Sequence, residues 1–271
     1  MNLFSIENKV ILITGGGGIL GGEMASYLLN NGATIVILDY KENIVNSAIE
    51  RLKKINNNVT GFICNALDEK NLKEVSDKII AKFGKIDILI NAAGGNMPGA
   101  TISVDQTIFD VNIDHFKKVV DLNLFGCILP SLIFGKEMVK NNKGVIINIS
   151  SMTAQSAITR VVGYSASKAA IDNFTKWLSV ELATKFGEGI RVNAIAPGFF
   201  IGNQNRNLLV DQETGKFTER GETIIKNTPM KRFGETNELN GTIHYLCAEA
   251  SKFVTGIVVP IDGGFSAFNG V

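Results

Sequence analysis

The chain has 271 residues, 45% of them hydrophobic, so it is long enough to bury one large core. Its 27 basic and 26 acidic residues give a net charge of +1, which argues against a nucleic-acid binder that relies on phosphate contacts but leaves room for a small anionic substrate. Three widely spaced cysteines form no metal-ligand pattern, so we expect no metal site and three small buried side chains.

The N-terminal segment, residues 1–9, lacks the apolar run of a signal peptide. No apolar stretch in the sequence reaches the roughly 20 residues that a membrane span needs. We therefore expect a cytoplasmic protein that binds neither membrane nor nucleic acid.

Seven short apolar runs are each expected to form a buried strand, and amphipathic stretches lie between them, most clearly at 42–55, 69–83 and 164–185. Because the runs are apolar on both faces, we predict a parallel sheet covered by helices on each side. The alternation predicts an α/β fold: a single-domain Rossmann fold over residues 1–271 with a doubly wound seven-stranded sheet. The predicted strands are Lys9–Thr14, Thr34–Asp39, Val59–Cys64, Ile86–Ile90, Gly144–Ile149, Ile190–Ile195 and Gly256–Pro260.

A glycine-rich turn, Thr14-Gly-Gly-Gly-Gly-Ile-Leu-Gly21, follows the first strand and opens a helix. The GxGxxG pattern within it is weak alone, because a tight turn without a ligand also matches it. A strand before it and a helix after it favour a dinucleotide site, where backbone N–H groups at a helix N-terminus meet the pyrophosphate. We expect the cofactor contacts of this turn at Gly15, Gly18, Ile19 and Leu20.

Asp39 ends the second strand, 18 residues after Gly21. A carboxylate there accepts hydrogen bonds from the ribose hydroxyls and repels a 2′-phosphate, so we expect NAD(H) to be preferred. Tyr40 and Lys41 follow; the lysine supplies one cation, which keeps NADP(H) possible. The alternative is that Asp39 only caps the next helix.

Tyr164 and Lys168 lie four residues apart on a predicted helix, and Ser151 follows the fifth strand. The spacing places the phenol and the ammonium on one helix face, where the ammonium is expected to lower the tyrosine pKa. Tyr164 could then exchange a proton with a substrate hydroxyl or carbonyl, while Ser151 donates a hydrogen bond to the same oxygen.

Over nearly its whole length the sequence resembles the short-chain dehydrogenase/reductase family. The matching pieces are the turn at 14–21, Asn91-Ala-Ala-Gly94, Asn123, Ser151, Tyr164-Ser-Ala-Ser-Lys168 and Arg191-Val-Asn-Ala-Ile-Ala-Pro-Gly198. The resemblance implies that Tyr164 is the acid/base, that Lys168 assists it and holds the nicotinamide ribose, and that Ser151 orients the carbonyl. It also implies that Asn123 anchors a water in a proton relay.

The same resemblance implies further cofactor contacts and a homotetramer built through the helices that carry Asn123 and Tyr164. Asn91 would help to hold the sheet beside the cofactor. Three positions depart from the family pattern: Ile19 stands in a glycine place, Asn65 where aspartate is common, and Gly202 where a threonine often grips the cofactor. The implied contacts are Asn65, Ala66, Asn91, Ala92, Ala93, Tyr164, Lys168, Pro197 and Gly198.

The second half also resembles the D-mannonate oxidoreductase, or fructuronate reductase, subgroup, which implies reduction of D-fructuronate to D-mannonate. The resemblance lies in Gly94-Gly-Asn96, Asn148-Ile-Ser-Ser-Met152, Asn193-Ala-Ile-Ala-Pro-Gly-Phe-Phe200, Gln204-Asn-Arg206, Thr228-Pro-Met-Lys-Arg-Phe-Gly234, Phe253-Val-Thr-Gly256 and Asp262-Gly-Gly-Phe-Ser-Ala-Phe268.

A sugar acid needs a cation for its carboxylate and polar partners for its hydroxyls. We expect the long polar segment 199–228 to form a lid over such a site. The alternatives are that the arginines form surface salt bridges, that the substrate is another keto-aldonate or a neutral polyol, or that the protein is a non-catalytic dinucleotide sensor. The expected substrate contacts are Asn96, Ser151, Arg160, Gln204 and Arg206, with Arg232 behind them.

Overall fold

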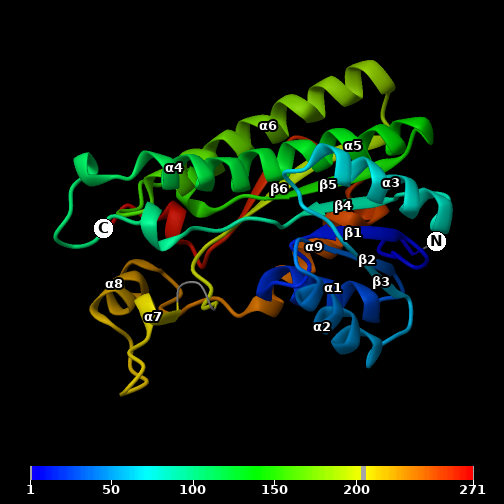
Figure 1. The fold of residues 1–271 in the computed structure, drawn as a ribbon. Coiled ribbons are helices and arrows are strands. Elements are labelled where there is room, and N and C mark those ends of the chain that lie inside the picture. The colour runs from blue at the N-terminus through cyan, green and yellow to red at the C-terminus, as the bar shows by residue number, and fades with distance from the viewer. Residues whose placement is uncertain (1, 203–205, 271) are drawn as a thin grey trace.

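The computed structural model describes residues 2–202 and 206–270 and has a seven-stranded sheet in which every neighbouring pair is parallel (Figure 1). The strand order is β3-β2-β1-β4-β5-β6-β7. This is the doubly wound order: the first three strands are added toward one edge of the sheet, and β4 starts a second series toward the other edge. The predicted fold class is confirmed. The strands are β1 Val10–Thr14, β2 Thr34–Asp39, β3 Val59–Ile63, β4 Ile88–Asn91, β5 Gly144–Ile149, β6 Ile190–Pro197 and β7 Val258–Ile261.

Helices cover both faces of the sheet (Figure 1). On one face lie α3 Glu69–Phe83, α4 Ile113–Val120, α5 Gly126–Lys140 and α6 Val162–Phe186, and on the other lie α1 Ile19–Asn30, α2 Glu42–Lys53 and α9 Asn240–Cys247. Two shorter helices, α7 Arg206–Leu209 and α8 Glu219–Asn227, stand apart beyond the sheet.

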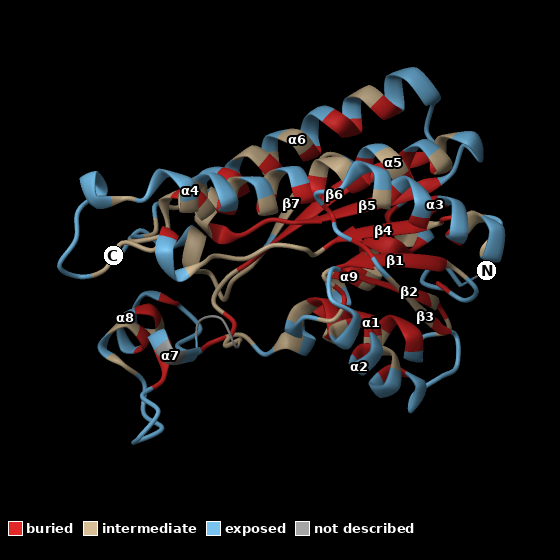
Figure 2. Ribbon diagram, in the orientation of Figure 1, coloured by how far each residue is buried: buried red, intermediate tan, exposed pale blue. Residues whose placement is uncertain are grey.

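The central strands are buried along their whole length, whereas the two edge strands are not (Figure 2). Most residues of β3 and β7 are half-buried, because an edge strand has a neighbour on one side only. The expectation that all seven runs are buried on both faces is therefore wrong for these two strands.

Two strands start two residues later than predicted, each for a local reason. Before β4, the Asp87 carboxylate accepts the Val10 N–H at 2.8 Å and pairs with Lys85 at 2.8 Å, so Asp87 belongs to the irregular segment that leads into the strand. Before β7, Gly256 has φ +78°, a left-handed conformation that interrupts an extended chain.

The continuous helical run Ile113–Lys140 passes a test of length and apolarity for crossing a membrane, with a mean hydropathy of 1.5. A π-helical turn, Asp121–Phe125, joins α4 to α5 within it, and charged side chains such as Asp121 and Lys136 leave no uninterrupted apolar stretch of this length in the sequence. Of the most apolar 18-residue stretch in this run, 44% is buried. Helix α5 packs on β4 and β5, as a core helix does.

The segment predicted as a lid forms two short helices with an apolar cluster of their own. Leu209, Val210 and Ile224 pack with Phe233, which also makes an edge-on contact with the Phe217 ring at 5.2 Å between centroids. Thr218 caps α8 by accepting the Gly221 N–H. This segment is therefore folded by its own packing, separately from the core of the sheet.

Candidate active site

Four elements bring the predicted catalytic residues to the carboxyl edge of the sheet, where doubly wound folds bind ligands. Ser151 lies two residues beyond β5, and Tyr164 and Lys168 lie in the first two turns of α6. Asn123 is fully buried in the π-helical turn between α4 and α5. Residues that are far apart in the sequence thus meet at one end of the sheet.

Tyr164 and Lys168 lie on the same face of α6, and the Lys168 Nζ is 5.4 Å from the centroid of the tyrosine ring. Burial raises the pKa of Tyr164, and a hydrogen bond with Ser151 opposes that rise. The net direction is opposite to the one expected from the Tyr164–Lys168 spacing, because desolvation of a phenolate outweighs this hydrogen bond. Tyr164 is thus protonated at neutral pH.

Lys168 is buried and donates a hydrogen bond to the Ile149 carbonyl at 2.7 Å. Burial lowers the pKa of Lys168 to about 8, while nearby Cys127 and Asp172 oppose the fall. The lysine is consequently charged at neutral pH but titrates within a few units of it.

Asn123 is held by the segment after β4 rather than by α6. Its amide oxygen accepts the Gly95 N–H at 3.0 Å, and its amide nitrogen donates to the Gly95 carbonyl at 2.7 Å and the Val119 carbonyl at 2.8 Å. Gly94 lies so close that an added Cβ would sit 2.7 Å from the Asn123 amide oxygen and 3.4 Å from the Lys168 Nζ. Glycine at position 94 therefore keeps these two groups together, a role that the sequence reading missed.

Asn91 links β4 to α5 and β5 through its side chain. Its amide nitrogen donates to the Ser131 hydroxyl at 2.8 Å and to the Asn148 amide oxygen at 2.9 Å. Asn148 in turn donates to the Thr175 hydroxyl at 2.9 Å, which carries the polar network from β4 through β5 to α6. This buried network fixes the spacing of the elements that carry the site.

The glycine-rich turn has the close backbone packing that a dinucleotide site requires. Gly15 has φ +63°, and an added Cβ would lie 2.8 Å from the Ala93 Cα and 2.9 Å from the Ala92 carbonyl. Helix α1 begins at Ile19 after an N-cap glycine, Gly18, so no side chain caps its first N–H groups. The N–H groups of Ile19 and Leu20 in this first turn are suited to an anion.

The Asp39 carboxylate lies beside the glycine-rich turn and is only 7% exposed. One oxygen accepts the Tyr40 N–H at 2.9 Å and the other the Gly17 N–H at 3.3 Å. Burial raises the pKa of Asp39, and these two hydrogen bonds and Lys41 oppose the rise. The carboxylate is positioned against the turn, and it does not act as a side-chain cap of α2, whose N-cap is Lys41.

The remaining predicted cofactor residues also lie at this edge. The Asn65 amide oxygen accepts the Leu67 N–H at 3.0 Å. Ala66 is buried, and Pro197 ends β6. Gly198 donates its N–H to the Ile261 carbonyl at 2.9 Å, and a Cβ on it would lie 2.6 Å from the Asp262 Cα.

The predicted substrate residues have different surroundings. The Asn96 amide nitrogen donates to the Thr101 hydroxyl at 2.8 Å, while its amide oxygen is buried and has no partner among the described residues. Arg160 is half-buried, and its Nε donates to the Ile102 carbonyl at 2.7 Å. Arg206 is exposed at the start of α7, and Gln204 lies outside the described residues.

Arg232 is paired with a carboxylate of the same chain. Its two terminal nitrogens contact the Glu238 carboxylate at 2.7 and 2.6 Å in an exposed, bidentate ion pair. This is a surface salt bridge of the kind that the sequence left open as the alternative for the arginines.

Two further polar groups near the site received little weight from the sequence. The Thr153 hydroxyl, two residues after Ser151, is buried and has no partner within the described part of the chain. Arg220 in α8 reaches the loop before α6, with its Nη1 3.4 Å from the Thr159 hydroxyl. No sequence signal marks Arg220, because only the packing of α8 brings it there.

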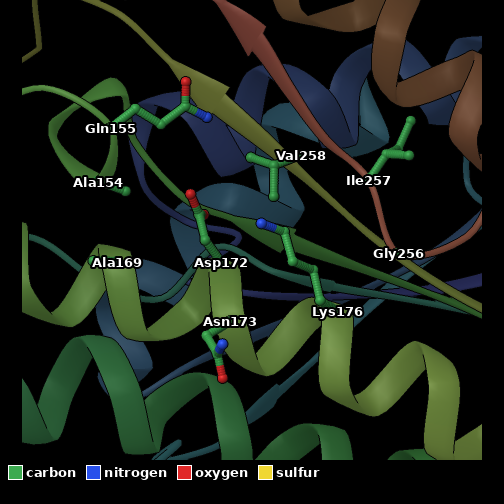
Figure 3. Close-up of a pocket in the computed structure, with 9 residues that line it drawn as sticks. All are labelled: Ala154, Gln155, Ala169, Asp172, Asn173, Lys176, Gly256, Ile257 and Val258. Atoms are coloured by element: carbon green, nitrogen blue, oxygen red, sulfur yellow. The ribbon is translucent and has the colours of Figure 1, made fainter.

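A cleft of about 650 Å³ lies beside this site, between α6 and the segment that leads into β7 (Figure 3). Asp172 and Lys176 project into it from α6, and Gln155 reaches it from the loop after β5. None of the predicted catalytic or cofactor residues lines it. The described residues contain no cluster of three or more potential metal ligands.

Residues 18–266 match the family model described as enoyl-(acyl carrier protein) reductase, of the short-chain dehydrogenase/reductase type. An oxidoreductase of Bacillus subtilis (strain 168) named UxuB, described as uncharacterized, is 42% identical over 276 residues, which cover 98% of each chain. A 2-dehydro-3-deoxy-D-gluconate 5-dehydrogenase of Formosa agariphila is 34% identical over 269 residues, covering 98% of this chain and 96% of the relative.

Among solved structures, a candidate D-mannonate oxidoreductase from Haemophilus influenzae with bound NAD superimposes with a TM-score of 0.91. It is 44% identical in sequence, and the match covers 98% of each chain.

Proposed function

Because the chain belongs to the short-chain dehydrogenase/reductase family, a family of NAD(P)-dependent oxidoreductases, we propose that it reduces D-fructuronate to D-mannonate with NADH. The reaction is a reversible hydride transfer at a keto carbon of a six-carbon sugar acid. The observation that carries the proposal is the meeting of Ser151, Tyr164 and Lys168 with unpaired polar groups at one edge of the sheet.

The residues at the glycine-rich turn fit a nicotinamide dinucleotide. The first turn of α1 offers its N–H groups to the pyrophosphate, and Asp39 lies where it can accept hydrogen bonds from the adenosine ribose. The solved structure from Haemophilus influenzae has bound NAD, which supports NAD(H) as the preferred cofactor here. The bound cofactor supplies the hydride, and the chain supplies the proton and the positioning.

In this proposal Tyr164 donates its phenolic proton to the carbonyl oxygen of the substrate as the hydride arrives at the carbon. The Ser151 hydroxyl donates a hydrogen bond to the same oxygen, where negative charge develops. The Lys168 ammonium stabilises the phenolate that Tyr164 becomes, and Asn123 holds the backbone at Gly95 beside it.

The substrate is proposed from polar groups that the chain itself leaves unpaired. The buried side-chain oxygens of Asn96 and Thr153 have no hydrogen-bond partner among the described residues. The hydroxyl groups of a sugar would serve as these partners. Arg160, on the same loop as Thr153, offers a cation for a carboxylate, and Gln204 and Arg206 belong to the proposed lid over residues 199–228. The Formosa agariphila relative is named for a keto sugar acid, which supports this class and makes 2-dehydro-3-deoxy-D-gluconate the second candidate substrate.

We also propose a cytoplasmic homotetramer. Three large apolar side chains on the outer faces of α5 and α6 are exposed to solvent in the single chain: Leu132 at 54%, Trp177 at 60% and Val180 at 66%. Contact with a second copy through these helices would cover them. Sedimentation of the purified protein measures the assembly directly.

The proposal is tested by initial rates with a panel of substrates and both nicotinamides. We expect the highest kcat/KM with D-fructuronate and NADH, a lower value with 2-dehydro-3-deoxy-D-gluconate, and little turnover of the neutral ketose D-fructose. If D-fructose is reduced as well as the keto acids, the sugar-acid assignment is wrong. If no carbonyl compound of the panel is reduced, a dinucleotide sensor becomes the better account.

A further inference from the structure

Two arginines from different segments meet beside the catalytic loop. Arg160 lies in the loop between Ser151 and α6, and Arg220 lies in the first turn of α8. The Arg220 Nη1 and Nη2 are 3.4 Å from the Thr159 hydroxyl and 3.5 Å from the Thr159 carbonyl. Since Thr159 directly precedes Arg160 in the chain, the packing of α8 on this loop places the Arg220 guanidinium group beside the segment that carries Arg160.

Arg160 is held in a fixed position that leaves part of its guanidinium group unused. Its Nε donates to the Ile102 carbonyl at 2.7 Å, and its own carbonyl accepts the Ile102 N–H at 3.0 Å. Its backbone has φ +78°, an uncommon conformation for a side chain of this size, which costs about 1 kcal/mol or more. Both Nη groups are without a hydrogen-bond partner in the described part of the chain, so they can serve as donors.

Neither arginine has a carboxylate partner in the part of the chain that the structure describes. The six ion pairs among the described residues include neither Arg160 nor Arg220, whereas Arg232 has Glu238. Burial and the charge of Arg160 both lower the pKa of Arg220, as expected when two cations are close together. Two half-buried guanidinium groups that repel each other, with free donors, form a site for an anion.

The location of this pair connects it to the reaction. Arg160 lies four residues before Tyr164, on the loop that begins at Ser151 and contains the unpaired Thr153 hydroxyl. Its contact residue, Ile102, lies on the segment that starts at Asn96 after β4. A ligand bound by both arginines would therefore touch the lid and the two loops that flank the catalytic residues.

We propose that Arg160 and Arg220 together bind the carboxylate of the substrate, an assignment that rests on the proposed function. One guanidinium comes from the catalytic loop and one from the lid, so substrate binding joins the two. Arg220, which the sequence did not single out, is thus a specificity-determining residue.

The test compares Arg220→Gln and Arg160→Gln with Lys226→Gln, which removes an equal charge from an exposed position on α8. We expect the first two variants to raise the KM for D-fructuronate by ~30-fold or more, the usual effect of removing one partner of a close ionic contact. The kcat and the affinity for NADH should change by less than about 3-fold. Arg220→Lys should recover part of the loss, because a lysine keeps the charge without the bidentate geometry.

A binding experiment separates this inference from the proposed function. Tartrate, a small carboxylate, and mannitol, a neutral polyol, are titrated calorimetrically into NADH-saturated wild type and Arg220→Gln, with thermal unfolding to check that the variant is folded. Tartrate binding that is at least 10-fold weaker in the variant, with mannitol unaffected, supports the site even if no hexuronate is turned over. Equal tartrate binding by both proteins, or none by the wild type, overturns it. Turnover of D-fructuronate with an unchanged KM in Arg220→Gln also overturns it, while leaving the proposed function intact.

Discussion

Replacing Asp39 by asparagine should weaken the preference of the protein for NADH over NADPH. The carboxylate is 7% exposed, and its oxygens accept the N–H groups of Gly17 and Tyr40. An asparagine has the same shape, and its amide oxygen can still accept one of these hydrogen bonds, so the glycine-rich turn should keep its conformation. The substitution removes mainly the negative charge.

The expected magnitude follows from the position of that charge. A 2′-phosphate bound about 4 Å from the carboxylate would be opposed by about 4 kcal/mol per pair of unit charges at an effective dielectric constant of about 20. Salt and the partial exposure of the phosphate should reduce this to about 2–3 kcal/mol, which is about a 30- to 150-fold effect. Burial raises the pKa of Asp39, so acidification should neutralise the carboxyl and weaken the discrimination at a higher pH than for an ordinary aspartate.

The assay is the initial rate of reduction of D-fructuronate with NADH and with NADPH, for wild type and Asp39→Asn, between about pH 5 and pH 8. We expect the wild type to favour NADH and the variant to gain about 30- to 150-fold in kcat/KM for NADPH. With NADH the variant should lose about 10-fold, because a charged acceptor for the ribose hydroxyls is gone. Equal use of both nicotinamides by the wild type, or no gain of NADPH activity in the variant, would refute the reasoning.

Three further outcomes are expected. The rate of reduction should decline as pH rises through about 8, because the buried Lys168 ammonium then loses its proton. In a pH–rate profile, a Lys168→Arg variant, which stays charged, should show this decline at a higher pH. An unchanged profile would exclude Lys168 as the source of the decline. Gly94→Ala should place a methyl group 2.7 Å from the Asn123 amide oxygen and lower kcat by about 10-fold or more, and a kcat equal to wild type would mean that this contact has no role in turnover. Asn91→Leu should lower the free energy of unfolding in urea by about 2–4 kcal/mol, because the Asn148 amide oxygen loses a buried partner; a loss under 0.5 kcal/mol would contradict that network.

The sheet was predictable because its signals are local. Each central strand is an uninterrupted apolar run, and the glycine-rich turn follows β1 as a dinucleotide turn should. Strand β4 starts later than predicted because of a side-chain contact of Asp87, and β7 because of the backbone conformation of Gly256. Neither feature alters the hydrophobic periodicity from which the strands were predicted. Strand existence thus followed from pattern, while strand ends depended on tertiary contacts.

In the site, too, some features followed from local sequence patterns and others depended on tertiary packing. The positions of Ser151, Tyr164 and Lys168 followed from motif spacing, since helical geometry sets which residues share a face. The direction of the Tyr164 pKa did not, because desolvation depends on everything packed around the phenol. Arg220 was missed for the same reason: its place beside Thr159 depends on how α7 and α8 pack on their own small apolar cluster.

The identity of Tyr164 as the proton donor in an NADH-dependent reduction of a sugar acid is tested most directly by one comparison. The oxidation of NADH in the presence of D-fructuronate is followed for wild type and Tyr164→Phe, together with the dissociation constant for NADH. We expect the variant to bind NADH within about 3-fold of wild type and to lose ~10²–10⁴-fold in kcat, the range for a positioned acid/base. A Tyr164→Phe enzyme that reduces D-fructuronate at a rate comparable to wild type would contradict the account.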